Sequence, residues 1–165
     1  MDSKTTLNKN HVVATLGKPA TEITKQDLIG YVISENIEMV NFMYPASDGR
    51  LKTLSFVIND PDYLDTILSQ GERVDGSSLF EHIEPGNSDL YVMPRFSTAF
   101  RDPFAEIPTL TMLCAFFDKD GKRLANSPDN TLEKACRAFT DVTGLRFEAM
   151  GELEYYVIYP TEQLF

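Results

Sequence analysis

The sequence has 165 residues, of which 42% are hydrophobic and 24% charged, and its net charge is −10. This composition excludes a disordered chain, and the acidic surplus argues against nucleic acid or an anionic membrane surface as a partner, because both select clustered Lys and Arg. No apolar run reaches the ~18 residues of a membrane span, and the polar start lacks a signal peptide's hydrophobic stretch, so we expect a cytoplasmic protein.

The first half of the chain predicts a helix followed by a β-hairpin. Residues 1–20 are polar and patternless, and we expect a flexible arm there. A helix is predicted to begin after Thr24, which can form a capping box with Asp27. The turn YPASDG then separates two runs rich in apolar residues, which indicates a hairpin with strands at 37–44 and 50–58.

The middle of the chain predicts a second helix and two more strands. Asp60 followed by Pro61 is typical of a helix start, and Gly71 marks its end. Strands are expected at 89–93 and 109–118, and the second leads into the tight turn DKDG. This turn lacks the closing Glu of a calcium loop, so we interpret it as part of a hairpin.

The last part of the chain predicts a third helix and a final strand. The helix begins at Pro128 and ends at Gly144. Its expected buried face consists of Leu132, Ala135, Cys136 and Phe139. The segment 147–160 is rich in aromatic and β-branched residues and predicts a strand.

The cysteines and histidines do not form a familiar site. Cys114 and Cys136 lack close spacing, which favours reduced residues over a disulfide. His11 and His82 each stand without a second His or Cys nearby, which favours surface residues over metal ligands or bases. The common nucleotide and zinc signatures are absent from the sequence as well.

Two acidic residues stand at the beginning of the predicted last strand. Glu152 and Glu154 are two apart, so in a strand both would point to one face, ~6–7 Å from each other. Carboxylate oxygens at that spacing suit Mg²⁺ or Mn²⁺ and can serve two neighbouring ions. Because Glu-x-Glu is a short and common pattern, the spacing alone favours a solvent-facing strand end over a metal site.

A second unusual stretch is VDGSSLFEHIEPGNSDLYV, which lies between a predicted helix and a predicted strand. Its Asp-Gly and Gly-Asn pairs are ordinary turn sequences. Local pattern alone therefore indicates a structured surface loop.

Together the two stretches resemble the glutamine synthetase family. The family's signature is an Asp-Gly-Ser-Ser loop, a gap of six to eight residues, and a small-acidic pair that leads into a strand. Here the matching residues are Asp75, Gly76, Ser77 and Ser78 and, after a gap of eight, Asn87, Ser88 and Asp89. The segments MPRFSTAFRDPF and GELEYYVIY are similar to further family segments in the same order.

The resemblance implies an α+β fold: a β-grasp domain at 21–122, followed at 123–165 by the first helix and strand of an incomplete catalytic domain. Glu152 and Glu154 match the first two glutamates that bind the family's two divalent ions, Mg²⁺ or Mn²⁺. The family's nucleotide-binding residues lie downstream, so none is expected in this stretch, and its catalytic residues remain unknown.

The activity that the resemblance implies is the ATP-dependent joining of glutamate and ammonia through a γ-glutamyl phosphate. In the family, homo-oligomeric rings place the active site between subunits, and the signature loop belongs to the domain that packs against the neighbouring subunit. These 165 residues are therefore expected to be a portion of a longer enzyme and inactive alone.

Departures from the family pattern keep two alternatives open. Members often carry an Asp two positions after a Phe in the first hairpin, where it helps to bind ammonium, whereas here Phe42 is followed by Met43 and Tyr44. Asp48 is not at the matching place, and we do not assign it that role. The alternatives are a γ-glutamyl ligase that uses an organic amine or polyamine, and a non-catalytic β-grasp interaction or regulatory module.

Overall fold

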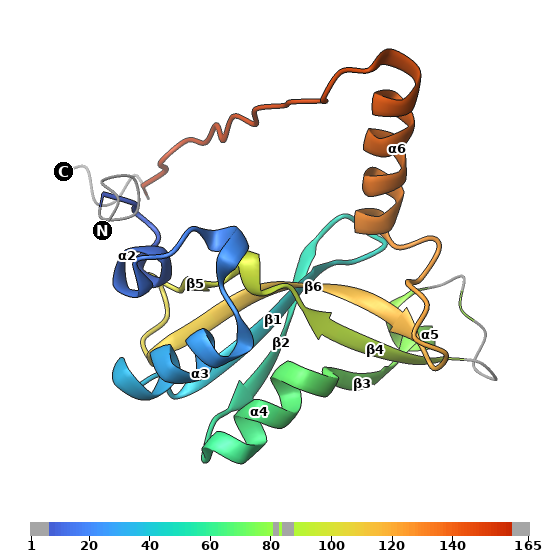
Figure 1. Cartoon of the computed structure of the whole chain (residues 1–165). Helices are drawn as coiled ribbons and strands as arrows, with labels where there is room; N and C mark the ends of the chain where they lie inside the picture. The colour runs from blue at the N-terminus through green and yellow to red at the C-terminus, as the bar shows by residue number, and fades with distance from the viewer. Residues whose placement is uncertain (1–6, 81–82, 84–87, 160–165) are drawn as a thin grey trace. The chain divides into compact units, whose positions relative to one another are not determined.

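The computed structural model describes residues 7–80, 83 and 88–159 (Figure 1). The chain forms two compact units that divide after Leu132. The first unit contains a mixed β-sheet with helices, and the second contains most of a helix and the segment that follows it. None of the helices in the described ranges has the length and apolarity that a membrane crossing requires.

The first unit is built on one sheet with the strand order β2-β1-β6-β4-β3, and β5 pairs with β6 beside this path. The strands are β1 Met39–Pro45, β2 Leu51–Val57, β3 Glu72–Asp75, β4 Asp89–Pro94, β5 Phe100–Arg101 and β6 Thr109–Asp118. The central strands β1 and β6 run parallel, and every other pair is antiparallel. The predicted hairpin and the strands near 89–93 and 109–118 are confirmed.

The described ranges also contain six short helices and one long helix. They are α2 His11–Leu16, η1 Ala20–Glu22, α3 Lys25–Ser34, α4 Pro61–Gln70, α5 Gly76–Leu79, η3 Phe96–Thr98 and α6 Pro128–Thr143. The predicted starts of α3 and α4 are confirmed, because Thr24 and Asp27 form a reciprocal capping box and the Asp60 carboxylate accepts the Tyr63 N–H.

The core lies between one face of the sheet and the helices α3 and α4, which lie on the same side of it (Figure 1). Alternate residues of β1 are fully buried, as period-two patterning requires for a strand with one covered face. Phe116 of β6 is central to this core, because its ring contacts Tyr44 and Phe80 edge to face, with centroids 5.1 and 5.0 Å apart.

The structure differs from the expected flexible arm at residues 10–17. Here Asn10 caps α2 by accepting the Val12 N–H, and Gly17 ends it in the left-handed conformation. Val12 and Val13 are buried, and α2 contacts α3 and β5. The two apolar residues therefore fix this helix to the first unit.

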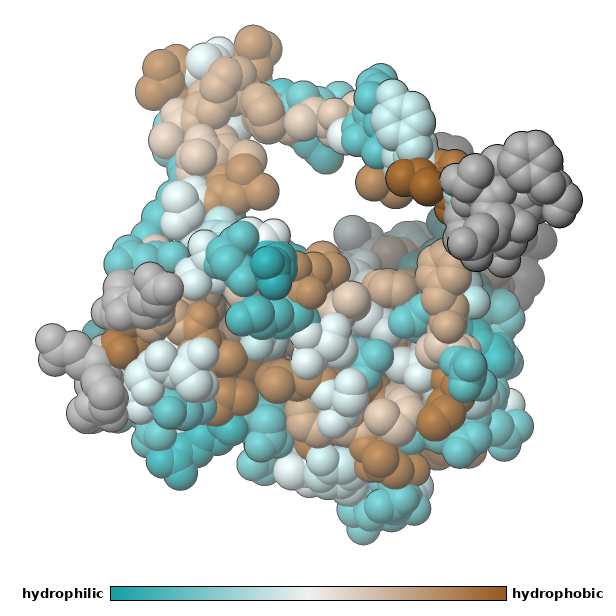
Figure 2. Space-filling model, turned by 180° about the vertical axis from the view of Figure 1, so that it is seen from behind, coloured by the Kyte–Doolittle hydropathy of each residue, from teal (hydrophilic) through white to brown (hydrophobic). Residues whose placement is uncertain are grey.

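The expected buried face of α6 is wrong. Leu132 is 62% exposed and Phe139 38% exposed, and Ala135 and Cys136 are not buried either. In the C-terminal unit, Figure 2 shows brown, hydrophobic side chains along the surface. An amphipathic helix buries its apolar side only where another element packs against it. Within the second unit the Phe139 ring contacts that of Phe147, with centroids 5.7 Å apart, and this single ring contact leaves Phe139 partly exposed.

The expected strand at 147–160 is also wrong for its described part, residues 147–159, which are extended and exposed without strand pairing. A strand requires a hydrogen-bonded neighbour, and no described strand pairs with this segment. Residue 160 lies outside the described residues. The assignment of 123–165 to a catalytic domain, with its boundary at 122/123, stays a prediction.

Candidate functional site

The two ends of the Asp-Gly-Ser-Ser signature meet at the edge of the sheet. The antiparallel pairing of β3 with β4 places Asp75 opposite Asp89. Asp89 accepts a hydrogen bond of 2.6 Å from the Arg73 guanidinium on the neighbouring strand. The signature loop is therefore closed at its base by backbone pairing and one exposed ion pair.

Asp75 organises the first turn of the loop. Its carboxylate accepts hydrogen bonds from the backbone N–H and the hydroxyl of Ser77, at 3.0 and 2.7 Å. The hydroxyl of Ser78 donates to the Asp75 carbonyl at 2.7 Å. Side-chain hydrogen bonds from Ser77 and Ser88 hold the pKa of Asp75 below its usual value, so the residue is an ionised acceptor that shapes the loop.

Gly76 allows the two ends of the loop to approach each other. Its N–H donates to the Ser88 carbonyl at 2.6 Å, and a Cβ at this position would lie 2.7 Å from Leu90 Cδ1 and 2.9 Å from the Ser88 carbonyl oxygen. Phe80, which is 1% exposed, anchors the far side of the turn in the core. Asn87 lies outside the described residues.

The described signature residues thus form one structured unit. Asp75, Gly76, Ser77, Ser78, Ser88 and Asp89 lie at one end of the β3–β4 pair. Their polar groups mainly satisfy one another, which favours a positioning function for the loop over a chemical one.

Glu152 and Glu154, the expected metal ligands, lie in the extended segment of the C-terminal unit. Both are exposed. Among the described residues, no group of three or more His, Cys, Asp and Glu could hold a metal ion. A magnesium site uses about six oxygen ligands, several of them water, so two carboxylates can form only part of one. Their role as ligands stays a prediction.

Sequence reasoning missed a polar cluster where α2 meets α3. His11 Nδ1 lies 2.8 Å from the hydroxyl of the buried Tyr31, and His11 Nε2 lies 4.0 Å from Glu35. Arg101 of β5 lies 3.4 Å from the same Glu35 carboxylate. The signal was present as Asn10 and Gly17, a cap residue at each end of the apolar run HVVATL.

A mixed sheet with a parallel central pair and helices on one face is the arrangement expected of a β-grasp domain. The family described as "Glutamine synthetase, beta-Grasp domain" matches residues 36–119, just over half of the chain. The chain therefore belongs to the glutamine synthetase family through this domain. The β-grasp fold and the family implied by the signature are confirmed.

Relatives among known proteins agree with this assignment. The chain is 34% identical over 130 residues to glutamine synthetase of Gallus gallus, which covers 76% of the chain and 32% of the relative. It is 32% identical over 122 residues to 3-hydroxylaminophenol mutase of Cupriavidus pinatubonensis, which covers 72% of the chain and 25% of the relative. The chain thus spans a quarter to a third of the length of these relatives.

Solved structures share the fold. The glutamine synthetase of Plasmodium falciparum aligns with a TM-score of 0.62 at 18% identity, over 74% of this chain and 23% of that one. A complex titled "GmaS/ADP complex-Conformation 1" aligns with a TM-score of 0.60 at 11% identity, over 70% of this chain and 26% of that one. At these identities the similarity extends to the fold alone.

Proposed function

We propose that these residues are the N-terminal part of an ATP-dependent ligase that joins glutamate and ammonia through a γ-glutamyl phosphate. The family match over residues 36–119 carries this proposal. The hydrogen bonds among the described signature residues support it, because a β-grasp domain that retains this turn can position a partner surface. By the same proposal, the complete protein is a cytoplasmic homo-oligomer in which this loop faces a neighbouring subunit.

In this proposal Glu152 and Glu154 hold two divalent cations, Mg²⁺ or Mn²⁺. The cations would offset the charge of the triphosphate and of the acceptor carboxylate during phosphoryl transfer. Both glutamates are exposed and end in hard oxygen donors, which these ions prefer. The remaining ligands and the nucleotide-binding residues would come from sequence beyond these positions, so we expect the 165 residues alone to be inactive.

An observation in the first hairpin favours an organic amine as the alternative acceptor. At the place where family members often carry an Asp, this chain has Tyr44, which is 2% exposed. Burial raises the pKa of the Tyr44 hydroxyl, so this side chain stays neutral and offers no anion for ammonium. Asp48 in the turn is engaged with the backbone N–H of Arg50 at 3.1 Å.

The relative named 3-hydroxylaminophenol mutase suggests a third reaction class, the rearrangement of 3-hydroxylaminophenol. A non-catalytic interaction module is the remaining alternative. It differs from the enzymes because it would turn over none of these substrates.

One assay series separates these possibilities. The protein that contains these residues together with its remaining sequence is incubated with glutamate, ATP and Mg²⁺ or Mn²⁺, and phosphate release is measured with ammonia and with a panel of organic amines. Conversion of 3-hydroxylaminophenol is followed without ATP. Glutamine formation with ammonia supports the proposal, whereas turnover confined to an organic amine or to the hydroxylamine contradicts it.

A further inference from the structure

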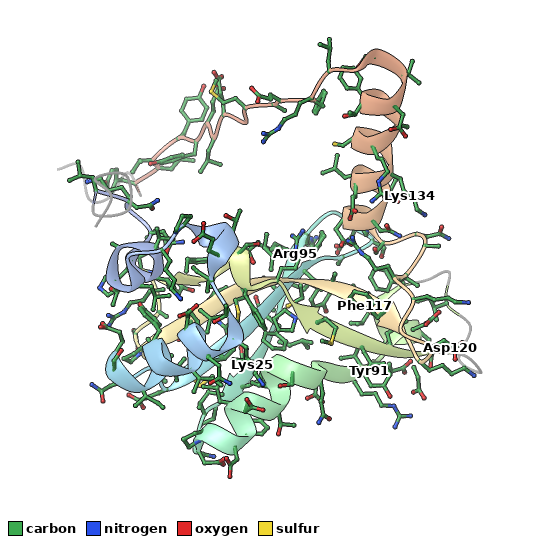
Figure 3. The ribbon with its side chains drawn as sticks, in the orientation of Figure 1. Lys25, Tyr91, Arg95, Phe117, Asp120 and Lys134 are labelled. Carbon is green, nitrogen blue, oxygen red and sulfur yellow. The ribbon has the colours of Figure 1, made fainter. Side chains whose placement is uncertain are left out.

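A pocket of about 410 Å³ is lined by residues of β4, of the end of β6 and of the turn that follows it, and by Gln70 at the end of α4. Tyr91 and Phe117 line it and are directly opposite each other in the antiparallel pair. Figure 3 shows the two residues on neighbouring strands, with Asp120 beyond them at the following turn. Opposed side chains in such a pair have Cβ atoms about 4.5–5.5 Å apart, so the two aromatic residues stand side by side in the pocket wall.

Met93 extends this surface next to Tyr91 along β4. Gly71 leaves room for it, because a Cβ on Gly71 would lie 2.6 Å from the Met93 sulfur and 2.4 Å from the Val92 carbonyl oxygen. A thioether beside aromatic rings provides an apolar, polarisable surface. All three side chains are only partly buried, so each keeps surface that a ligand can cover.

The turn after β6 forms a fixed wall of the pocket. Asp118 Oδ1 accepts the backbone N–H groups of Asp120 and Lys122, each at 2.9 Å, and the Asp118 N–H donates to the Lys122 carbonyl at 2.8 Å. These bonds hold the turn in one conformation. The pocket therefore exists before a ligand binds, which lowers the entropic cost of binding.

The charges around the pocket cancel. The turn carries two carboxylates, on Asp118 and Asp120, and two ammonium groups, on Lys119 and Lys122. Arg73, opposite Tyr91 on β3, is paired with Asp89. Gln70 supplies a primary amide, which both donates and accepts hydrogen bonds. This balance gives neither an anion nor a cation an electrostatic advantage.

We propose that this pocket binds an uncharged aromatic compound with hydrogen-bonding substituents, whose ring lies against Tyr91 and Phe117. The volume is in the lower range of small-molecule sites, which suits one substituted ring system. Aromatic contacts supply the affinity, and Gln70 and the turn select the substituents. The inference does not depend on the proposed ligase activity.

The test is a titration of the ¹⁵N-labelled chain, followed by two-dimensional NMR. The probe is 3-aminophenol at neutral pH, and the matched probes are cyclohexanol, benzoate and benzylammonium. Amide shifts are expected at residues 91–93 and 117–121, with 3-aminophenol binding more tightly than the other three. Equal binding of cyclohexanol, or shifts scattered over the chain, would overturn the proposal.

Two variants sharpen the test. Tyr91→Leu and Phe117→Leu keep apolar bulk, remove one ring each, and are expected to weaken 3-aminophenol binding about fivefold to tenfold. Phe104→Leu is the control, because Phe104 is 93% exposed and does not line the pocket. This variant should bind 3-aminophenol as tightly as the parent chain does. Unchanged affinity for 3-aminophenol in both pocket variants would overturn the proposal. If either variant misfolds, the comparison of the four probes on the parent chain decides whether the proposal holds.

Discussion

At the scale of single residues, the signature loop depends most on Gly76. A Cβ there would lie within 3 Å of Leu90 and of the Ser88 carbonyl. We expect Gly76→Ala to lower the free energy of unfolding by about 1–3 kcal/mol, because the loop must open to admit the methyl group. Urea denaturation measures the change.

Gly30 provides the matched control for that substitution. It lies inside α3, and a Cβ there meets nothing within 4 Å. Gly30→Ala should therefore stabilise the protein by about 0.5–1 kcal/mol, since alanine favours helix more than glycine does. Equal changes in the free energy of unfolding for the two alanine variants would show that the close contacts of Gly76 with Leu90 and Ser88 do not require a glycine there.

Asp27 gives the fold a defined pH dependence. Its carboxylate accepts hydrogen bonds from Lys18 at 2.6 Å and from the Thr24 hydroxyl at 2.7 Å, which lower the pKa of Asp27 from 3.8 to about 2. Because the folded-state pKa lies below the unfolded one, the ionised group stabilises the fold fully above pH 3.8. This contribution is lost as the pH falls from 3.8 to about 2.

Asp27→Asn is expected to cost about 1 kcal/mol of unfolding free energy at pH 7, since the capping box and the ion pair are partly exposed to solvent. The difference from the parent chain should shrink toward zero at pH 2. Urea denaturation at pH 7, 3 and 2 measures it, with Glu106→Gln, an exposed carboxylate of the same unit, as control. A difference that stays constant with pH would contradict the role of the carboxylate charge.

At the scale of elements, α2 is the helix that joins the N-terminal residues to the first unit. Val12 is 0% exposed. Val12→Ala should lower the free energy of unfolding by about 2 kcal/mol, because it leaves a space between α2 and the core. It should also speed hydrogen exchange at the Ala14 and Gly17 amides, which close the helix.

Val142→Ala is the control for this variant, because Val142 lies on α6 and is 87% exposed. Its stability should be unchanged or slightly higher, as alanine favours helix. Rapid exchange of the α2 amides in the parent chain would instead support the flexible arm that the sequence suggested.

Elements with strong end signals were predictable from the sequence. The capping box at Thr24 and the Asp60-Pro61 pair located α3 and α4 because cap preferences act within one turn. The sequence did not predict β3, because this strand has only four residues, three of them charged and one apolar, so its sequence lacks the alternation typical of a strand. Its strand state comes from pairing with β4, which is distant in sequence, and local pattern does not report such pairing.

The candidate site was predictable only in part, because sequence pattern reports local structure and not contacts with distant elements. The Asp-Gly-Ser-Ser pattern indicated a structured loop, and the structure adds that Asp75 and Gly76 serve its closure. The apolar faces of α6 and of residues 147–159 predicted burial and pairing, yet both processes need a partner surface. Hydrophobic periodicity and secondary-structure propensity indicate which side chains suit burial. They do not indicate which other element will cover those side chains.

At the scale of the whole molecule, we propose that this β-grasp domain is part of a metal-dependent ligase in which Glu152 and Glu154 bind the cations. Both glutamates are exposed and outside the core of the first unit. Their substitution by glutamine should therefore leave the stability of that unit unchanged, so a loss of activity would report on function. Glu148, an exposed carboxylate of the same segment, offers a matched control.

The most direct test measures Mg²⁺- and Mn²⁺-dependent glutamine formation by the protein that carries these residues together with its remaining sequence. We expect Glu154→Gln to lower kcat by about 100-fold or more and to raise the metal concentration needed for half-maximal rate, because a direct ligand is lost. Glu148→Gln should match the parent protein in both quantities. Full activity with unchanged metal dependence in Glu154→Gln would contradict the account.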